Sequence, residues 1–255
     1  MTIDSAMWQA DLDLDRLPRW TCPTCSIGHL RLDKDTYVEA PAKTQDHPDH
    51  WLGVCALILK CDEDACQEAA VLAGGAATRQ EVDWNQATNE GEVYELRYVT
   101  PHTIVPAPRV FRYSGPAVLK GVQAQIDRAS SLYWADPSAA VAALRTGVEV
   151  LLDSVSIPRT AEKKRGGERR LTMKERLAIY EKRAPSNQSR LAVRALTELG
   201  HQGAHEVSLG HDQALDAFRI MEAALEALFS PETRPLHDLM AQIAALGRHP
   251  DTPKP

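Results

Sequence analysis

Two pairs of cysteines constrain the fold of this chain more than any other feature of its sequence. The first pair is Cys22 and Cys25, within a Trp-Thr-Cys-Pro-Thr-Cys segment, and the second is Cys61 and Cys66. Each pair lies on an expected turn beside an apolar, β-like run such as residues 51–60. Zn²⁺ accepts four thiolates in a tetrahedron, and structural zinc stabilises small sheets with little core of their own. The pattern therefore predicts a zinc-ribbon-like domain with one structural zinc ion bound by all four cysteines.

Free structural thiols are the alternative interpretation of the same cysteines. The fifth, Cys55, lies inside the apolar run and is expected to pack as a small hydrophobic side chain. The N-terminus has no basic stretch followed by an apolar one, so we expect no secretory signal and a cytoplasmic location. Thiols stay reduced in that compartment, which favours metal ligands or free thiols over disulfides.

Composition and charge exclude several classes of protein. Aromatic residues make up only 5% of the chain, so its core must consist mainly of Leu, Val and Ala, which favours helices. The net charge of −6 gives no general attraction to nucleic acid, and any such binding would need a local basic patch. No apolar run approaches the roughly 18 residues that would indicate a membrane span.

The chain divides into a strand-rich half and a helix-rich half. The predicted fold class is α+β, with a small N-terminal β zinc ribbon followed by an all-α bundle. Within the first half, the polar residues 75–92 are expected to form a loop. The predicted domains are a zinc-ribbon-like domain at residues 17–100, a proline-rich linker at 101–116, a helical bundle at 117–247 and a disordered tail at 248–255.

The helical half is organised around residues 136–155. Apolar side chains recur there at helical spacing from Val141 to Val155, and Arg145 and Glu149 lie at the edge of that stripe. One interpretation is an Arg145–Glu149 pair within the helix; the other is a polar cluster completed by the helix that contains His201 and His205. Further helices are expected at residues 115–134, 172–183, 186–204, 212–229 and 231–246.

The order of these motifs resembles the bacterial family DUF4145. The matching parts are the cysteine-rich start, the proline-rich segment, the stretch from Trp134 through Arg145 and Glu149, and the segment from Gly200 to His205. The helical domain of that family is similar to the HEPN superfamily, which includes metal-independent ribonucleases and toxins of defence systems. The resemblance therefore implies a HEPN-like helical domain, often dimeric, and a role in prokaryotic defence.

One position departs from the pattern of the similar nucleases. Those enzymes have an arginine, usually followed by a polar residue, and a histidine five residues after the arginine. His205 takes the histidine position and His201 the polar position, but Gly200 stands where the arginine is expected. Arginine would stabilise the charge that develops on the phosphate, so its absence weakens the nuclease hypothesis. Arg194 and Arg145 are the candidates to replace it.

Two functional hypotheses follow, together with a plainly structural one. The first is a non-catalytic or weakly catalytic module, an accessory part of a defence system that binds nucleic acid (RNA or DNA) or a protein partner. The second is a metal-independent ribonuclease whose catalytic set is His205, His201, Arg145, Glu149 and Arg194. The third is a purely structural dimer, formed through the helical domain. A basic loop is the candidate nucleic-acid-binding site, unless it is simply solvated; its residues are Lys163, Lys164, Arg165, Arg169 and Arg170.

Overall fold

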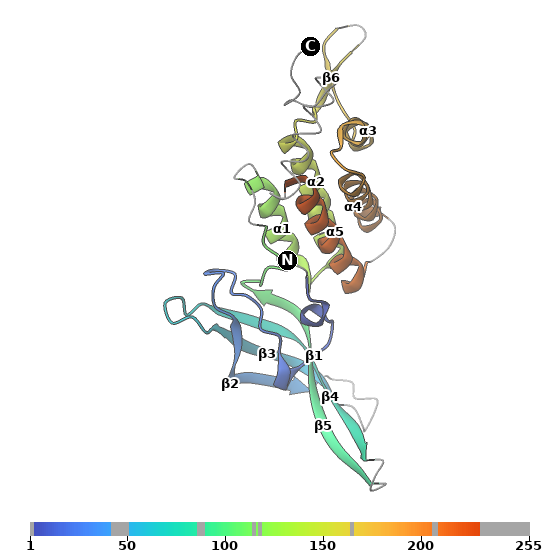
Figure 1. Ribbon diagram of the computed structural model, residues 1–255. Coiled ribbons are helices and arrows are strands. Elements are labelled where there is room, and N and C mark those ends of the chain that lie inside the picture. Colours follow the sequence, from blue (N-terminus) through green and yellow to red (C-terminus); the bar gives the residue numbers. More distant parts are fainter. Residues whose placement is uncertain are drawn as a thin grey trace, which may run out of the picture. The chain divides into compact units, whose positions relative to one another are not determined.

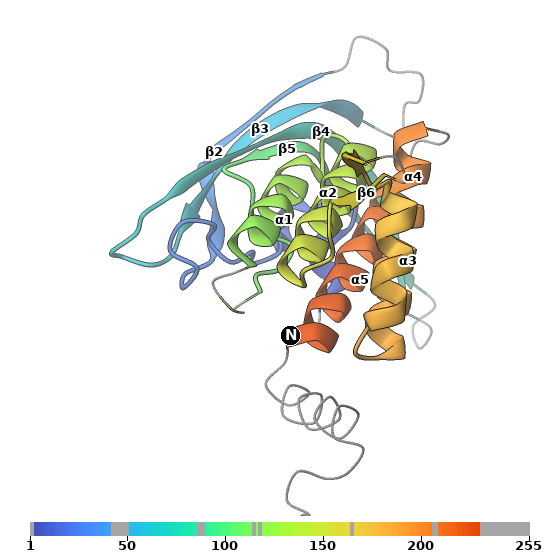
Figure 2. The ribbon, with the colours of Figure 1, turned by 90° about the horizontal axis from the view of Figure 1, so that it is seen from above.

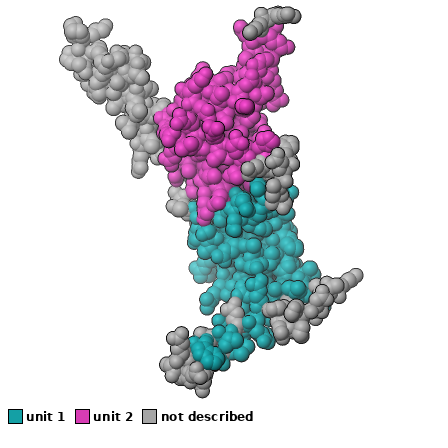
Figure 3. Space-filling model, turned by 90° about the vertical axis from the view of Figure 1, so that its right-hand side faces the viewer, with its two compact units in different colours: residues 1–110, 127–140, 208–215 teal, residues 111–126, 141–207, 216–255 magenta. Residues whose placement is uncertain are grey.

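The computed structural model divides the chain into two compact units, which Figure 3 shows in different colours. The sheet unit comprises residues 1–110, 127–140 and 208–215, and the helical unit comprises residues 111–126, 141–207 and 216–255. The structure describes residues 3–41, 51–85, 90–113, 116, 119–163, 166–205 and 209–229.

The sheet unit is built on one antiparallel sheet of five strands in the order β1-β5-β4-β3-β2 (Figure 1). Two short 3-10 helices, η1 (Ser5–Trp8) and η2 (Leu14–Arg16), flank the first strand. The strands are β1 (Leu12–Asp13), β2 (Leu30–Pro41), β3 (Trp51–Cys61), β4 (Ala69–Asn85) and β5 (Glu90–Val105).

This sheet shows that the predicted fold class was wrong: the β region is not a small zinc ribbon. The expected loop at residues 75–92 instead contributes to β4 and β5, which have 17 and 16 residues. Among the described residues, β3 pairs with β4 as far as Thr78, and the rest of β4 pairs with the start of β5 as a two-stranded arm (Figure 1). Val82 and Trp84 alternate with polar residues in this arm, but both side chains are exposed, so this alternation does not mark a face of the core.

The body of the sheet shows the alternation that its sequence predicts. In β3, Cys55, Leu57 and Leu59 are buried, while Val54 on the opposite face is 57% exposed. Residues from outside the strands add a buried aromatic cluster to the sheet unit, in which the Tyr133 hydroxyl donates a hydrogen bond of 2.6 Å to the Trp8 carbonyl. The cluster comprises Trp8, Trp20, Tyr133 and Trp134.

Among its described residues, the helical unit contains all or part of five helices and one short hairpin. The helices α1, α2 and α5 also contribute residues to the sheet unit. In Figures 1 and 2, α3, α4 and α5 lie side by side. The bounds are α1 (Lys120–Leu132), α2 (Pro137–Ser154), β6 (Thr160–Glu162), β7 (Glu168–Arg170), α3 (Met173–Arg183), α4 (Asn187–His205) and α5 (His211–Phe229).

The helices arise where the apolar periodicity predicts them. The stripe of α2 is almost fully buried, including Leu144, Val148, Leu151 and Leu152. The start of α3 is stabilised by a capping box in which Thr172 and Glu175 satisfy each other's backbone N–H groups. The helix predicted at residues 231–246 lies outside the described residues.

Candidate metal centre

The four predicted cysteine ligands come together in the sheet unit. The sulfur atoms of Cys22, Cys25, Cys61 and Cys66 all lie within 4.8 Å of one another. The Sγ atoms of Cys22 and Cys66 are 3.8 Å apart, and those of Cys25 and Cys61 are 3.7 Å apart. Four sulfurs about 2.3 Å from a central ion in a tetrahedron would lie about 3.8 Å from one another. The spacing therefore fits a single ion bound by four thiolates.

Two tight turns position the four sulfurs. In the first, the amide of Ser26 donates to the carbonyl of Cys22 at 3.0 Å, and Ser26 has a positive φ of 58°. In the second, which follows the end of β3, the amide of Cys66 donates to the carbonyl of Glu63 at 2.9 Å. The hydroxyl of Thr24 donates to the Glu68 carboxylate at 2.5 Å and so joins the two turns.

Gly28 permits the close approach of the two turns. A Cβ atom at this position would lie 2.7 Å from the Sγ atom of Cys61 and 2.7 Å from the Cβ atom of Glu63. The Gly28 amide donates to the Cys25 sulfur at 3.4 Å. The sequence places a glycine three residues after Cys25 for this steric reason.

The surroundings of Cys25 and Cys61 shift the pKa values of these two thiols in opposite directions. Hydrogen bonds from the amides of Ile27 and Gly28 lower the pKa of Cys25 to about 7. Burial raises the pKa of Cys61 to about 12. Cys55, by contrast, is buried on β3 outside the cluster, and its thiol donates to the Gly75 carbonyl at 3.5 Å.

Of the predicted catalytic residues, Arg145 and Glu149 line one cavity of about 330 Å³ in the helical unit. Arg145 faces α4 closely, because a Cβ atom added to Gly200 would lie 2.5 Å from the Cβ atom of Arg145. Arg194 does not line this cavity; its side chain is 61% exposed and lies 3.8 Å from Glu181. His201 is exposed, and the side chain of His205 lies outside the described residues.

The basic loop forms the β6–β7 hairpin, which offers fewer unpaired cations than its sequence suggests. Arg169 makes two hydrogen bonds to the carboxylate of Glu175, at 2.6 and 3.0 Å. Lys163 is exposed, and Arg170 lines the same cavity as Arg145. Lys164 and Arg165 lie outside the described residues.

Sequence reasoning missed two arginines that line this cavity. Arg159 lies just before β6, and Arg176 lies in the first half of α3. The available signal was the helical spacing of Arg176 and Tyr180, four residues apart, which places an arginine on the buried face of α3.

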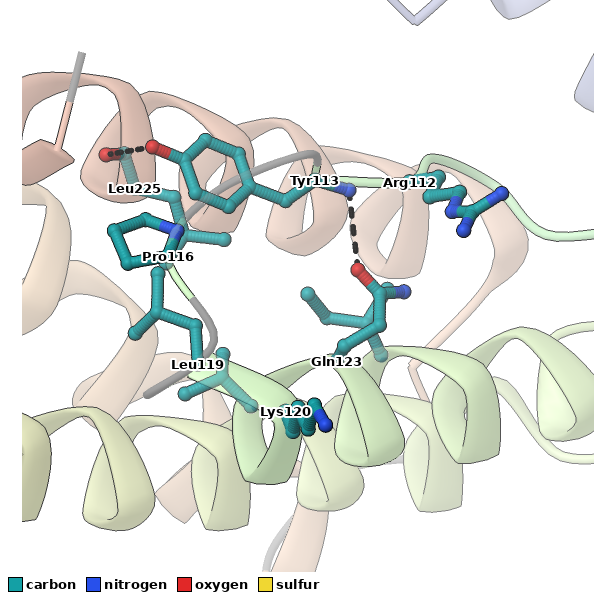
Figure 4. A pocket seen from close by; sticks show the side chains of 9 residues that line it. Arg112, Tyr113, Pro116, Leu119, Lys120, Gln123 and Leu225 are labelled. Atoms are coloured by element: carbon teal, nitrogen blue, oxygen red, sulfur yellow. Dashed lines mark hydrogen bonds between the residues drawn. The ribbon is translucent and has the colours of Figure 1, made fainter. Parts of the chain in front are cut away.

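A second, smaller cavity of about 190 Å³ lies in the helical unit, between the segment around Tyr113 and the helices α1 and α5 (Figure 4). The Tyr113 hydroxyl donates to the Leu225 carbonyl at 3.3 Å, and the Tyr113 amide donates to the Gln123 side chain at 3.1 Å. These polar groups of the lining are therefore already engaged with one another.

The fold and the cysteine cluster define a two-unit protein with a candidate four-thiolate metal centre in a five-stranded antiparallel sheet. Residues 10–102, which include most of that sheet and all four cysteines, match a family described as "Domain of unknown function (DUF8608)". The resemblance to DUF4145 was therefore wrong, and no HEPN-like family matches the chain. No curated protein and no solved structure matches the chain.

Among the residues that the structure describes, no helix is both long enough and apolar enough to cross a bilayer.

Proposed function

We propose that the protein is a non-catalytic binding module whose sheet unit is stabilised by one structural zinc ion. The cluster of Cys22, Cys25, Cys61 and Cys66 supports this proposal, because four thiolates complete a tetrahedral shell and leave no position for a substrate. Thiolates select soft or borderline ions, and the short sulfur–sulfur distances suit one ion rather than a cluster of several.

Metal analysis of protein purified without chelator tests the zinc proposal. We expect one zinc ion per chain in the wild type and in Cys55→Ser, because Cys55 lies outside the cluster. We expect a large loss of zinc in Cys66→Ser. Iron in place of zinc, or a zinc content that Cys66→Ser leaves unchanged, would contradict the proposal.

We further propose that the ligand of this module is nucleic acid, bound through the helical unit. Three observations support this: Lys163 is exposed on the β6–β7 hairpin, Arg170 is exposed at the end of β7, and Arg145 lies in the adjoining cavity. A local basic surface is required because the whole chain has a net charge of −6. Neither catalysis nor a role in defence is proposed, since both rested on the resemblance to DUF4145.

Fluorescence anisotropy with single- and double-stranded oligonucleotides at several salt concentrations tests this second part. We expect binding at low salt whose affinity falls steeply as salt rises, with a slope of about −0.9 per duplex phosphate contacted. The variant Lys163→Gln should reduce both the affinity and the slope. Absence of binding to either oligonucleotide at low salt would contradict nucleic acid as the ligand and favour a protein partner.

A further inference from the structure

We propose that the larger cavity of the helical unit is a binding site for a phosphate monoester, meaning the terminal phosphate of a nucleotide or of a nucleic-acid strand. This inference rests on the proposed function only in that the chain acts by binding. The cavity lies among α2, the β6–β7 hairpin and the start of α3, and its volume is about 330 Å³. Its polar lining consists of Arg145, Glu149, Arg159, Arg170, Thr172 and Arg176.

Two of the arginines that line this cavity have a buried Nε atom without an acceptor among the described residues. Arg176 is only 5% exposed, and its guanidinium group donates to Asp153 at 2.6 Å and to the carbonyls of Ile157 and Glu149 at 3.2 and 3.4 Å. Its Nε atom is buried without an acceptor among the described residues. The Nε atom of Arg145 is also buried and has no acceptor among the described residues. Buried N–H groups in folded proteins are nearly always hydrogen-bonded, so two such donors on side chains that line one cavity favour a bound acceptor beside them.

The charges around the cavity leave a positive excess. Four guanidinium groups, those of Arg145, Arg159, Arg170 and Arg176, accompany two carboxylates. One carboxylate is Glu149, and the other is Asp153, which accepts hydrogen bonds from both Arg159 and Arg176. The excess of two positive charges matches the charge of about −2 that a phosphate monoester has near neutral pH.

Arginine side chains suit the binding of phosphate, and packing holds Arg145 in place. A guanidinium group presents a planar set of donors that matches two phosphate oxygens at once, which a lysine ammonium cannot do. The backbone of α4 packs on the stem of Arg145, because Gly200 has no Cβ atom to keep it away. The Arg145 side chain is therefore positioned before any ligand arrives, which lowers the entropic cost of binding.

The burial of Arg176 selects a terminal phosphate over one in the middle of a strand. An internal phosphodiester has nucleotides on both sides, which keep it at the surface of a protein. A phosphate at the end of a molecule has one free side and can enter a cavity whose lining includes a side chain as buried as that of Arg176.

Isothermal titration calorimetry on the full, zinc-loaded chain tests the inference. The ligands are inorganic phosphate, a nucleoside 5′-monophosphate and the same nucleoside without phosphate. We expect the first two to bind and the nucleoside not to bind. Arg145→Gln and Arg170→Gln should each weaken binding by about tenfold or more, because each removes a charged hydrogen-bond donor.

Arg194→Gln is the matched control, since it removes the same charge from an exposed side chain outside the cavity. Its affinity should equal that of the wild type. Arg170 is exposed on β7, so Arg170→Gln keeps the test valid even where Arg145→Gln proves unstable. The inference is overturned if the wild type binds neither phosphate ligand, or if Arg194→Gln weakens binding as much as Arg170→Gln does.

A pair of oligonucleotides, with and without a 5′-phosphate, distinguishes the two sources of the phosphate. Tighter binding of the phosphorylated strand, abolished in Arg145→Gln, supports the site with a strand end as ligand. Binding of the monophosphate but of neither oligonucleotide supports the site with a free nucleotide as ligand, and it removes nucleic acid from the proposed function. Binding of both strands with equal affinity, unchanged in Arg145→Gln, overturns the site and leaves the proposed function standing.

Discussion

The cysteine cluster of the sheet unit and the arginine cluster of the helical unit are both built from segments distant in the sequence, but they satisfy their polar groups in opposite ways. The four sulfurs lie within 4.8 Å of one another. Of the cavity arginines, Arg159 and Arg176 already bind a carboxylate of the protein, that of Asp153. Four adjacent thiolates would repel one another strongly, whereas the arginines are partly neutralised in the folded chain.

This difference indicates that the fold requires the metal ion bound by the cysteines, whereas it forms without a ligand in the arginine cavity. A metal ion bound by the four cysteines would contribute directly to the folding free energy of the sheet unit. A phosphate in the arginine cavity would instead occupy donors that the helical unit holds in place through Asp153 and Gly200. The first ligand should therefore be permanent and the second exchangeable.

The largest expected effect concerns the cysteine cluster. Cys61→Ser should release the ion and unfold the sheet unit, because structural zinc sites contribute about 10–16 kcal/mol of apparent binding free energy. Zinc content and thermal unfolding followed by tryptophan fluorescence would measure this. Cys55→Ser, which changes another buried cysteine of β3, should keep both the ion and the melting temperature. A stable, zinc-free Cys61→Ser protein would show that the metal is not structural.

The next-largest expected effect concerns Arg176, the buried arginine of the cluster in the helical unit. Arg176→Met should lower the free energy of unfolding by about 3 kcal/mol, the lower end for a broken buried ion pair, because Asp153 keeps its bond to Arg159. Urea denaturation would measure the change. Arg159→Gln, whose side chain is 62% exposed, should cost clearly less, because solvent screens its ion pair with Asp153. Equal losses of unfolding free energy in the two variants would contradict the greater burial of Arg176 than of Arg159.

A smaller effect tests the packing that positions Arg145. Gly200→Ala should destabilise the protein by about 1 kcal/mol, since overpacking against Arg145 outweighs the better helix propensity of alanine. Gly147→Ala in α2 is the control, because its Cβ atom would first meet the flexible end of Met221, at 3.1 Å. Denaturant unfolding of both variants would measure the difference. A Gly200→Ala protein at least as stable as Gly147→Ala would show that α4 does not pack tightly on Arg145.

The smallest effect concerns ionisation beside the arginine cavity. Hydrogen bonds from Arg169, and then from Thr172, lower the pKa of Glu175 to about 2. Because this pKa is lower in the folded than in the unfolded chain, the stabilisation is present in full above the ordinary pKa of 4.5 and is lost as the pH falls towards about 2.

Arg169→Gln should therefore raise the pKa of Glu175, while the bonds from Thr172 keep it below its ordinary value. An NMR titration of the Glu175 carboxyl would measure this shift. Lys182→Gln, which removes a charge from the other end of α3, should leave the pKa of Glu175 unchanged. An unchanged pKa in Arg169→Gln would contradict the ion pair between Arg169 and Glu175.

Local chemistry made part of this structure predictable. The spacing of Cys22 and Cys25 indicated a metal-binding turn, and the apolar stripe around Leu144 indicated a buried helix. Both signals depend on residues within one turn or one helix, where spacing alone decides which side chains share a face. The order of the same motifs suggested the wrong family, because a cysteine turn and an amphipathic helix occur in many unrelated folds.

Only the tertiary structure decided the extent of the sheet and the composition of the arginine cavity. The long β4–β5 arm is stabilised by backbone pairing between two strands, which leaves little trace in the order of apolar residues. Arg145, Arg159 and Arg176 come from three separate segments, and each alone resembles a solvated surface cation. The sequence by itself determined which side chains could bind a metal ion; the folding of α2, α3 and the β6–β7 hairpin around one space decided which arginines share one cavity. Burial is a property of the packed chain, and it separates Arg176, which is 5% exposed, from Arg194, whose side chain is 61% exposed.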